Sequence, residues 1–270
     1  MFKTRWLVAL GLLMGLAVGA SGLAAQDGAT LNRVVANQVL RVGMSGAQPP
    51  FNMRGRTDSL MGLEVDLAKI LASAMQVELK IVTKPFSQLM AALAAGEVDM
   101  VISGMAITPG RAQTAGFVGP YMLSGKSILT NSTALAAIDS SDDINRRNLK
   151  LAALENSTSE AFIKRHAPQA QFVPIQDYDA GVQMVLNDEV DALVADMPIT
   201  LLSLMRYPDA GLATLSQPLT IEPIGIAVPA ADHRFQSLVQ NYLDTLEGTG
   251  ILEALRAKWL EDGSWVAALP

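Results

Sequence analysis

The sequence predicts an α/β protein of two lobes, each a mainly parallel sheet flanked by helices. The main observation is a repeat: residues 92–105 (ALAAGEVDMVISGM) and 184–197 (MVLNDEVDALVADM) share an apolar helical tail, Glu-Val-Asp and a short apolar strand. Alternating helices and strands with right-handed crossovers build mainly parallel sheets. Both repeated strands end in polar or small residues, and ligands bind at the carboxyl ends of strands in open α/β sheets. We therefore expect two lobes that face one ligand.

The first half of the chain alternates strands and helices. Its apolar and β-branched runs predict strands at 40–44, 77–81 and 98–102. Apolar residues at helical spacing predict a helix over 63–74. A second helix is expected over 87–95, with Ser87 as its N-cap and Gly96 as its stop. Pro49 and Pro50 indicate a loop after the first strand, because proline cannot donate to a sheet.

The second half repeats this alternation. Its patterns predict strands at 150–154, 171–174 and 190–194, with a helix over 157–165 between the first two and the repeated helix before the third. A further strand is expected at 224–228, followed by helices over 235–246 and 251–259. From these patterns alone, the lobe that the C-terminal elements join stays open.

The composition and the first residues indicate an exported globular protein. A chain of 270 residues, 50% hydrophobic and 17% charged, can bury a sizeable core. Basic Lys3 and Arg5, an apolar run over 6–20 and small residues before Gln26 predict a signal peptide over 1–25, cleaved in the periplasm. The alternative is an uncleaved membrane anchor, since 6–25 is just long enough to span a bilayer.

Charge and residue usage argue against several other functions. Cleavage would remove two of the 20 basic residues and leave 26 acidic ones, so nucleic acid is a poor partner. Cysteine is absent, and the only histidines, His166 and His233, are isolated. This pattern offers neither a metal-ligand cluster nor a Ser-His triad. We therefore expect no metal, no cofactor and no catalytic residue.

Arg111 is the first candidate binding residue. Thr108 and Pro109 predict a helix start, which puts Arg111 in the first turn. A cation there opposes the helix dipole, so an anionic partner would be favourable, and a guanidinium fits a carboxylate in bidentate fashion. A salt bridge to a nearby Asp or Glu explains the residue equally well.

Two further positions suggest binding groups. Ser157 and Glu160 form a capping-box pattern, and the same helix start, with Thr158, can bind an anion. Asp196 ends an apolar strand, where a buried carboxylate needs a cation or donors, and a ligand ammonium would supply them. Phe86, like Phe51, is expected at the same sheet edge, where single aromatics belong more often to the core than to a pocket.

These residues belong to motifs that resemble family 3 of the extracellular solute-binding proteins, the polar amino-acid receptors of ABC importers. The resemblance covers about 38–262, and its most specific part is Gly96-Glu97-Val98-Asp99 through Ile102-Ser103-Gly104-Met105-Ala106-Ile107-Thr108-Pro109-Gly110-Arg111. It implies the two-lobed periplasmic-binding-protein fold (type II), joined by two hinge strands. Lobe 1 would span 29–122 and 222–270, and lobe 2 would span 126–218.

The resemblance also implies roles for the candidate residues. Arg111 would hold a ligand α-carboxylate, helped by backbone N–H groups at Ala106 and Thr158, with Ser157 beside them. Asp196 would take the α-ammonium, helped by backbone carbonyls near Ser103 and Gly104.

Four positions depart from the family pattern. Gln48 stands where an aromatic often covers the ligand, which favours Phe86 as the stacking face. Ala106 replaces a Ser or Thr, Ser45 stands where receptors for basic amino acids can carry an acid, and Asn156 replaces a Gly. These changes do not favour a ligand with a basic side chain, although Glu155 keeps that class open.

The function that follows is a monomeric, non-catalytic periplasmic receptor that delivers an amino acid or similar zwitterion to an ABC permease. The alternative is a cyclohexadienyl (prephenate or arogenate) dehydratase-like enzyme on the same scaffold. Such an enzyme needs a pocket acid with a raised pKa, and Glu155 is the candidate.

Overall fold

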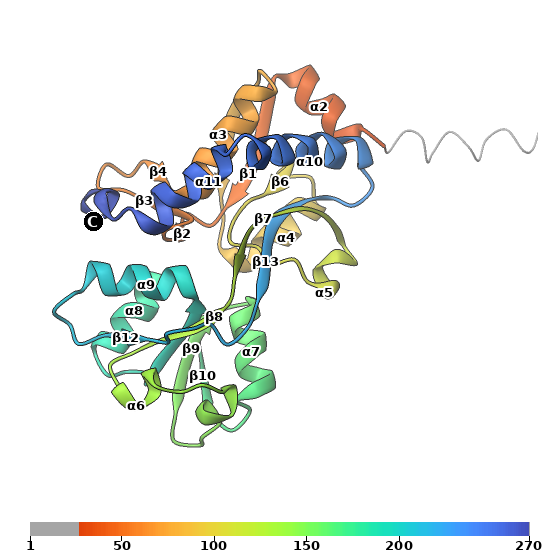
Figure 1. Ribbon diagram of the computed structural model, residues 1–270. Coiled ribbons are helices and arrows are strands. Elements are labelled where there is room, and N and C mark those ends of the chain that lie inside the picture. The colour runs from red at the N-terminus through yellow and green to blue at the C-terminus, as the bar shows by residue number, and fades with distance from the viewer. Residues whose placement is uncertain (1–26, 270) are drawn as a thin grey trace, which may run out of the picture.

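The computed structural model describes residues 27–269, and it contains two five-stranded sheets one above the other (Figure 1). The predicted signal peptide, residues 1–25, lies outside this range. Within it, no helix has both the length and the apolar character needed to cross a membrane.

The first sheet has the strand order β5-β1-β6-β13-β7. Strands β5, β1 and β6 are parallel, whereas β13 runs antiparallel to both β6 and β7. The strands are β1 (Val39–Met44), β5 (Glu78–Thr83), β6 (Met100–Val101), β7 (Ala115–Ser124) and β13 (Glu222–Pro229). The helices of this half are α2 (Ala29–Asn37), α3 (Leu63–Ala74), α4 (Leu89–Ala94), α5 (Pro109–Ala112), α10 (His233–Gly248) and α11 (Ile251–Arg256).

The second sheet has the order β10-β9-β11-β8-β12, again with three parallel strands and two antiparallel additions. Its strands are β8 (Lys126–Thr130), β9 (Lys150–Leu154), β10 (Gln171–Ile175), β11 (Ala192–Asp196) and β12 (Ala213–Thr214). Its helices are α6 (Thr133–Ala136), α7 (Thr158–His166), α8 (Tyr178–Leu186) and α9 (Met197–Arg206).

The repeat found in the sequence occupies equivalent places in the two sheets. Strand β6 follows the first copy of Glu-Val-Asp and β11 follows the second, and each is the central strand of its sheet. The central strand is fully covered: both residues of β6 and all residues of β11 are buried. The carboxyl ends of β6 and β11 therefore lie at equivalent places in the two sheets.

The remaining elements are short. Strands β2 (Ala47–Gln48), β3 (Asn52–Arg54) and β4 (Leu60–Met61) form a small antiparallel sheet. The 3₁₀ turns are η1 (Phe86–Gln88), η2 (Ser141–Ile144) and η4 (Ser264–Ala268), and η3 (Ala257–Glu261) is a π turn. In the C-terminal region, α10 packs on β7 and α2, and α11 packs on α3, so these helices cover the first sheet.

Two local predictions were wrong. Ser87 is not an N-cap: it lies inside η1, and α4 begins only at Leu89, without a side-chain cap. Helices commonly begin with such a 3₁₀ turn, and here the turn carries the buried Phe86 into the core. The predicted strand over 98–102 is reduced to Met100–Val101, although Gly96 does end the helix before it, at φ +70°.

The chain passes between the halves at two places. Strand β7 of the first sheet continues through Gly125 into β8 of the second, and the segment after β12 returns into β13 (Figure 1). One apolar cluster nevertheless contains core residues of both sheets, such as Val42 and Leu193. The two halves are therefore packed against each other in this structure.

Candidate ligand-binding site

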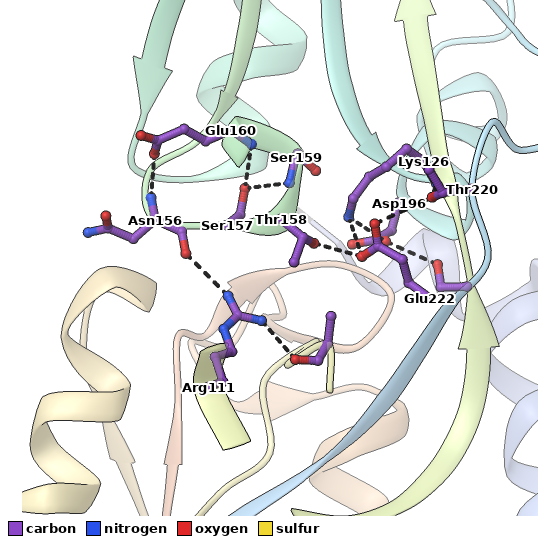
Figure 2. Close-up of polar contacts among 12 residues, drawn as sticks. Arg111, Lys126, Asn156, Ser157, Thr158, Ser159, Glu160, Asp196, Thr220 and Glu222 are labelled. Atoms are coloured by element: carbon purple, nitrogen blue, oxygen red, sulfur yellow. Dashed lines mark hydrogen bonds and ion pairs between the residues drawn. The ribbon is translucent and has the colours of Figure 1, made fainter. Parts of the chain in front are cut away.

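Arg111 reaches from the first half of the molecule to the second. Thr108 caps α5 by accepting a hydrogen bond from the Arg111 backbone N–H at 3.2 Å, as predicted. The guanidinium Nη1 donates to the Ala106 carbonyl at 3.0 Å, and Nη2 donates to the Asn156 carbonyl at 3.2 Å (Figure 2). The Phe86 ring lies 5.6 Å from the guanidinium carbon. This cation joins the β6–α5 loop to the turn before α7.

Arg111 has only neutral partners in the described part of the chain. Its hydrogen-bond acceptors are carbonyl oxygens, and no carboxylate lies within ion-pair distance, so the predicted alternative of a local salt bridge is not found among residues 27–269. Burial lowers the pKa of Arg111, while the negative charges of Glu222 and Asp196 raise it. A guanidinium stays protonated in proteins, so the half-buried positive charge of Arg111 remains available to an anion.

The start of α7 faces Arg111 and is capped as predicted, with one difference. The Ser157 hydroxyl accepts hydrogen bonds from the N–H groups of Ser159 and Glu160, at 3.1 and 3.2 Å. The Glu160 carboxylate accepts from the Asn156 N–H at 2.6 Å and not from Ser157. Asn156 has φ +58°, a left-handed conformation that Asn adopts more readily than most residues and Gly adopts freely. That explains why Asn can replace the Gly of the family pattern.

Asp196 is buried as predicted, but a protein cation already contacts it. The Lys126 Nζ lies 3.0 Å from the Asp196 Oδ1 and 3.1 Å from the Glu222 Oε2. Strand pairing places Lys126 directly opposite Asp196. The Ser124 hydroxyl also donates to the Asp196 Oδ1, at 3.2 Å. Sequence reasoning missed Lys126 and Glu222; the one signal was a lone lysine opening an apolar strand.

Lys126, Asp196 and Glu222 form a buried group, which we call the lysine–acid cluster. Their side chains are 1%, 7% and 16% exposed. The Thr158 hydroxyl donates to the Glu222 Oε2 at 2.7 Å, which ties the start of α7 to the cluster (Figure 2). Nearby, burial and the negative charges of Asp196 and Glu222 raise the pKa of Tyr178 well above its ordinary value. One lysine and two acids leave the cluster with one excess negative charge.

Several predicted site residues also belong to a polar network inside the first half. Ser103 donates to Gln48, and both side chains are buried. The Gly104 N–H donates to the fully buried Glu64 at 2.5 Å, and Asn52 and Tyr121 donate to the same carboxylate. Burial raises the pKa of Glu64, against the lowering effect of these hydrogen bonds. These hydrogen bonds hold the loops beneath the site, through the side chains of Gln48 and Ser103 and the backbone N–H of Gly104.

The other aromatic and acidic candidates lie as follows. Phe51 is fully buried in the core, and Phe86 is buried with its ring near Arg111. Glu155 is half-buried and accepts a hydrogen bond from Gln176 at 2.7 Å. No group of His, Cys, Asp and Glu residues able to hold a metal ion occurs within residues 27–269.

Two sheets with equivalent central strands, a cation in α5 and a buried acid at the end of β11 form the arrangement of a two-lobed solute-binding protein. The chain belongs to the bacterial extracellular solute-binding proteins, family 3, which it matches over residues 40–262.

Similar proteins and solved structures include amino acid-binding proteins and one enzyme. The chain is 26% identical to a cyclohexadienyl dehydratase of Pseudomonas aeruginosa over 90% of both chains, and 25% identical to an L-cystine-binding protein of Escherichia coli over 92% of both. The crystal structure of an ancestral amino acid-binding protein, a precursor of cyclohexadienyl dehydratase, is 30% identical, with a TM-score of 0.79 over 86% of this chain and 100% of that one. A putative ABC-transporter binding component of Wolinella succinogenes complexed with lysine is 29% identical, with a TM-score of 0.81 over 85% and 99%.

Proposed function

We propose that this protein is a periplasmic receptor that captures an amino acid, or a similar small zwitterion, between its lobes and delivers it to an ABC permease. The observation that carries the proposal is the separation of charge in the site. Arg111 has a positive charge without an acidic partner in the described residues, and the lysine–acid cluster has one excess negative charge. A ligand with one carboxylate and one ammonium would neutralise both.

In this proposal each end of the ligand has its own partners. The carboxylate replaces the carbonyl partners of Arg111 and accepts hydrogen bonds from the start of α7, at Ser157 and Thr158, and from the Ala106 N–H. The ammonium binds Asp196. The carboxylate and the ammonium of the ligand would each meet an opposite charge of the protein. Burial of both charge pairs favours closure of the lobes around the ligand. The lobes would be 29–122 with 222–270, and 126–218, hinged where β7 meets β8 and where β13 begins.

A dehydratase-like enzyme is the second candidate, favoured by the name of the Pseudomonas aeruginosa relative. Acid catalysis of this kind needs a carboxyl group held protonated near the ligand. Glu155 is half-buried and hydrogen-bonded to Gln176, and Glu64, whose pKa is raised, is enclosed by protein donors. Neither arrangement offers a proton to a ligand at Arg111, which supports the receptor over the enzyme.

A thermal-shift screen of the standard amino acids, with prephenate and arogenate added, tests the proposal. A ligand that binds only the folded protein raises its stability by about 2.7 kcal/mol at one hundred times its dissociation constant. We expect at least one amino acid to do so, and mass spectrometry should return prephenate and arogenate unchanged. Turnover of either compound, lost on Glu155→Gln, would establish the enzyme instead.

A further inference from the structure

The lysine–acid cluster bears on which amino acids the site accepts. Lys126 pairs with both acids at once, since its Nζ is within 3.1 Å of an oxygen of each. Three hydroxyl groups also donate to the acids of the cluster. The Ser124 hydroxyl donates to the Asp196 Oδ1, and the Thr158 hydroxyl donates to the Glu222 Oε2. The Thr220 hydroxyl donates to the Glu222 Oε1 at 3.4 Å. These contacts leave the Asp196 Oδ2 without a hydrogen bond in the described part of the chain.

The position of the cluster is set by strand pairing. Lys126 opens β8 opposite Asp196 of β11, and Glu222 opens β13 opposite Ser124, two residues before Lys126. All three side chains therefore lie where the chain crosses between the sheets, and little solvent reaches them. In such an environment an unmatched charge is costly, so the number of charges on the ligand matters.

From this count we infer that Lys126 selects ligands by their charge. Its positive charge cancels that of one of the two acids. The site therefore accepts an amino acid with a single ammonium group and a neutral side chain, and it disfavours ligands with two cationic groups, such as lysine and arginine. The inference rests on the proposed function, because it assumes that the ligand ammonium meets Asp196. Without Lys126 the two acids would have two excess negative charges, which suits a ligand with two cationic groups. Lys126 is thus a specificity-determining residue.

A series of variants tests this inference by changing the charge of the cluster in steps. Lys126→Met gives two excess negative charges, the double variant Lys126→Met with Glu222→Gln restores one, and Glu222→Gln alone gives none. Methionine approximates the volume of the lysine stem, and glutamine that of glutamate, so that charge is the main change. Calorimetry would measure each variant against neutral amino acids, lysine, arginine and the deaminated acid of the best neutral ligand.

The charge count predicts the ligand preference of each protein in the series. The native protein and the double variant should prefer the neutral amino acid over lysine and arginine by about tenfold or more, because a second cationic group on the ligand would stay unmatched in a site that little solvent reaches. Lys126→Met should shift this ratio at least about tenfold toward the cationic ligands. Glu222→Gln should narrow the gap between the amino acid and its deaminated form.

The outcomes separate this inference from the proposed function. Two results would overturn the role of Lys126 and leave the proposed receptor function standing. One is native protein that prefers lysine or arginine; the other is a preference ratio that does not move in Lys126→Met while Arg111→Ala still weakens binding at least ~30-fold. Native protein that binds no amino acid overturns the proposed function itself. If Lys126→Met does not fold, the other two variants still decide. A double variant that no longer prefers the neutral amino acid refutes the charge count, and so does a Glu222→Gln protein that keeps the native gap between the amino acid and its deaminated form.

Discussion

Arg111 is the residue on which the proposed carboxylate site depends. Its guanidinium presents several donors in one plane, and in this structure two of them already point at oxygen atoms, those of Ala106 and Asn156. A carboxylate can accept from the same fork in bidentate fashion. The residue therefore contributes geometry as well as charge.

We expect Arg111→Ala to weaken binding of the best amino acid by about 2 to 5 kcal/mol, or at least ~30-fold, because a desolvated carboxylate would lose its partner. Arg111→Lys is the matched control, because it keeps the positive charge and loses the planar guanidinium. Its affinity for the amino acid should fall between those of the native protein and Arg111→Ala. Calorimetry measures both. Equal affinity in all three proteins would place the carboxylate elsewhere.

Asp196 should act at the other end of the ligand. Asp196→Asn removes the charge that would meet the ammonium and keeps the size of the side chain. We expect it to blunt discrimination between the amino acid and its deaminated form, in a calorimetric comparison of the two ligands. Discrimination that stays at the native level would show that the ammonium binds another group.

Glu64 is a buried acid whose contribution to stability depends on pH. Burial raises its pKa in the folded protein above the ordinary 4.5, so the folded state holds this proton more tightly than the unfolded chain. A raised pKa of this kind stabilises the fold at low pH, and the contribution is lost as the pH rises from about the unfolded value through the folded one.

Glu64→Gln removes that titration and leaves the other acids in place. The difference in unfolding free energy, native protein minus variant, should therefore shrink as the pH rises above 4.5. Urea denaturation at a series of pH values measures it. A difference that grows with pH would mean that the carboxylate is stabilised by its hydrogen bonds more than it is penalised by burial.

Among the elements, α2 and α10 share a single N-terminal cap. Asp232 accepts hydrogen bonds from the N–H groups of Gly28, Thr30 and Leu31 at the start of α2, and from Phe235 at the start of α10, at 2.7 to 3.2 Å. The side chain is buried, and α2 has no cap of its own. One carboxylate therefore satisfies free donors of two helices.

Asp232→Ala should cost about 1 to 4 kcal/mol of unfolding free energy, since each lost cap costs roughly 0.5 to 2 kcal/mol. Asp177→Ala is the control, because Asp177 caps only α8, through the Ala180 N–H at 2.7 Å. Urea denaturation of both variants gives the comparison. A loss at Asp232 no larger than at Asp177 would mean that α2 does not depend on this cap.

At the scale of the whole molecule, an apolar contact joins the two halves far from the crossing strands. Leu201 and Met205 of α9 lie beside Trp259 and Trp265 of the C-terminal segment, around a crevice of about 20 Å³. Met205 approaches so closely that its methyl group would lie 2.4 Å from a Cβ added at Gly263. Figure 1 shows α9 of the second half directly below the C-terminal segment of the first.

We expect Met205→Asp to favour separation of the lobes, because a charge would replace an apolar contact that exists only when they are together. A smaller closed population lowers the apparent affinity in proportion, roughly tenfold for about 1.4 kcal/mol. X-ray scattering should show a larger radius of gyration without ligand. Ile251→Asp, on the exposed side of α11, is the control. Equal scattering and affinity in both would exclude a role of this contact in closure.

Local signals were enough to predict a large part of this protein. The repeat predicted a strand at each of the places of β6 and β11, although β6 is shorter and β11 begins and ends two residues later than expected. Thr108 and Ser157 were recognised as caps, because a cap depends on residues only a few positions apart. The start of α4 was missed, since the burial of Phe86 in a 3₁₀ turn depends on packing and not on the local pattern.

Long-range pairing determined the rest. Asp196 lies 70 residues from Lys126 in the sequence, and only a ligand ammonium was named as its partner, yet the antiparallel pairing of β8 with β11 places the two side chains together. Glu222 joins them only because β13 returns beside β7, and Asp232 caps a helix more than 200 residues earlier. Charges and caps of this kind depend on which strands become neighbours, and that is decided when the whole chain buries its apolar surface.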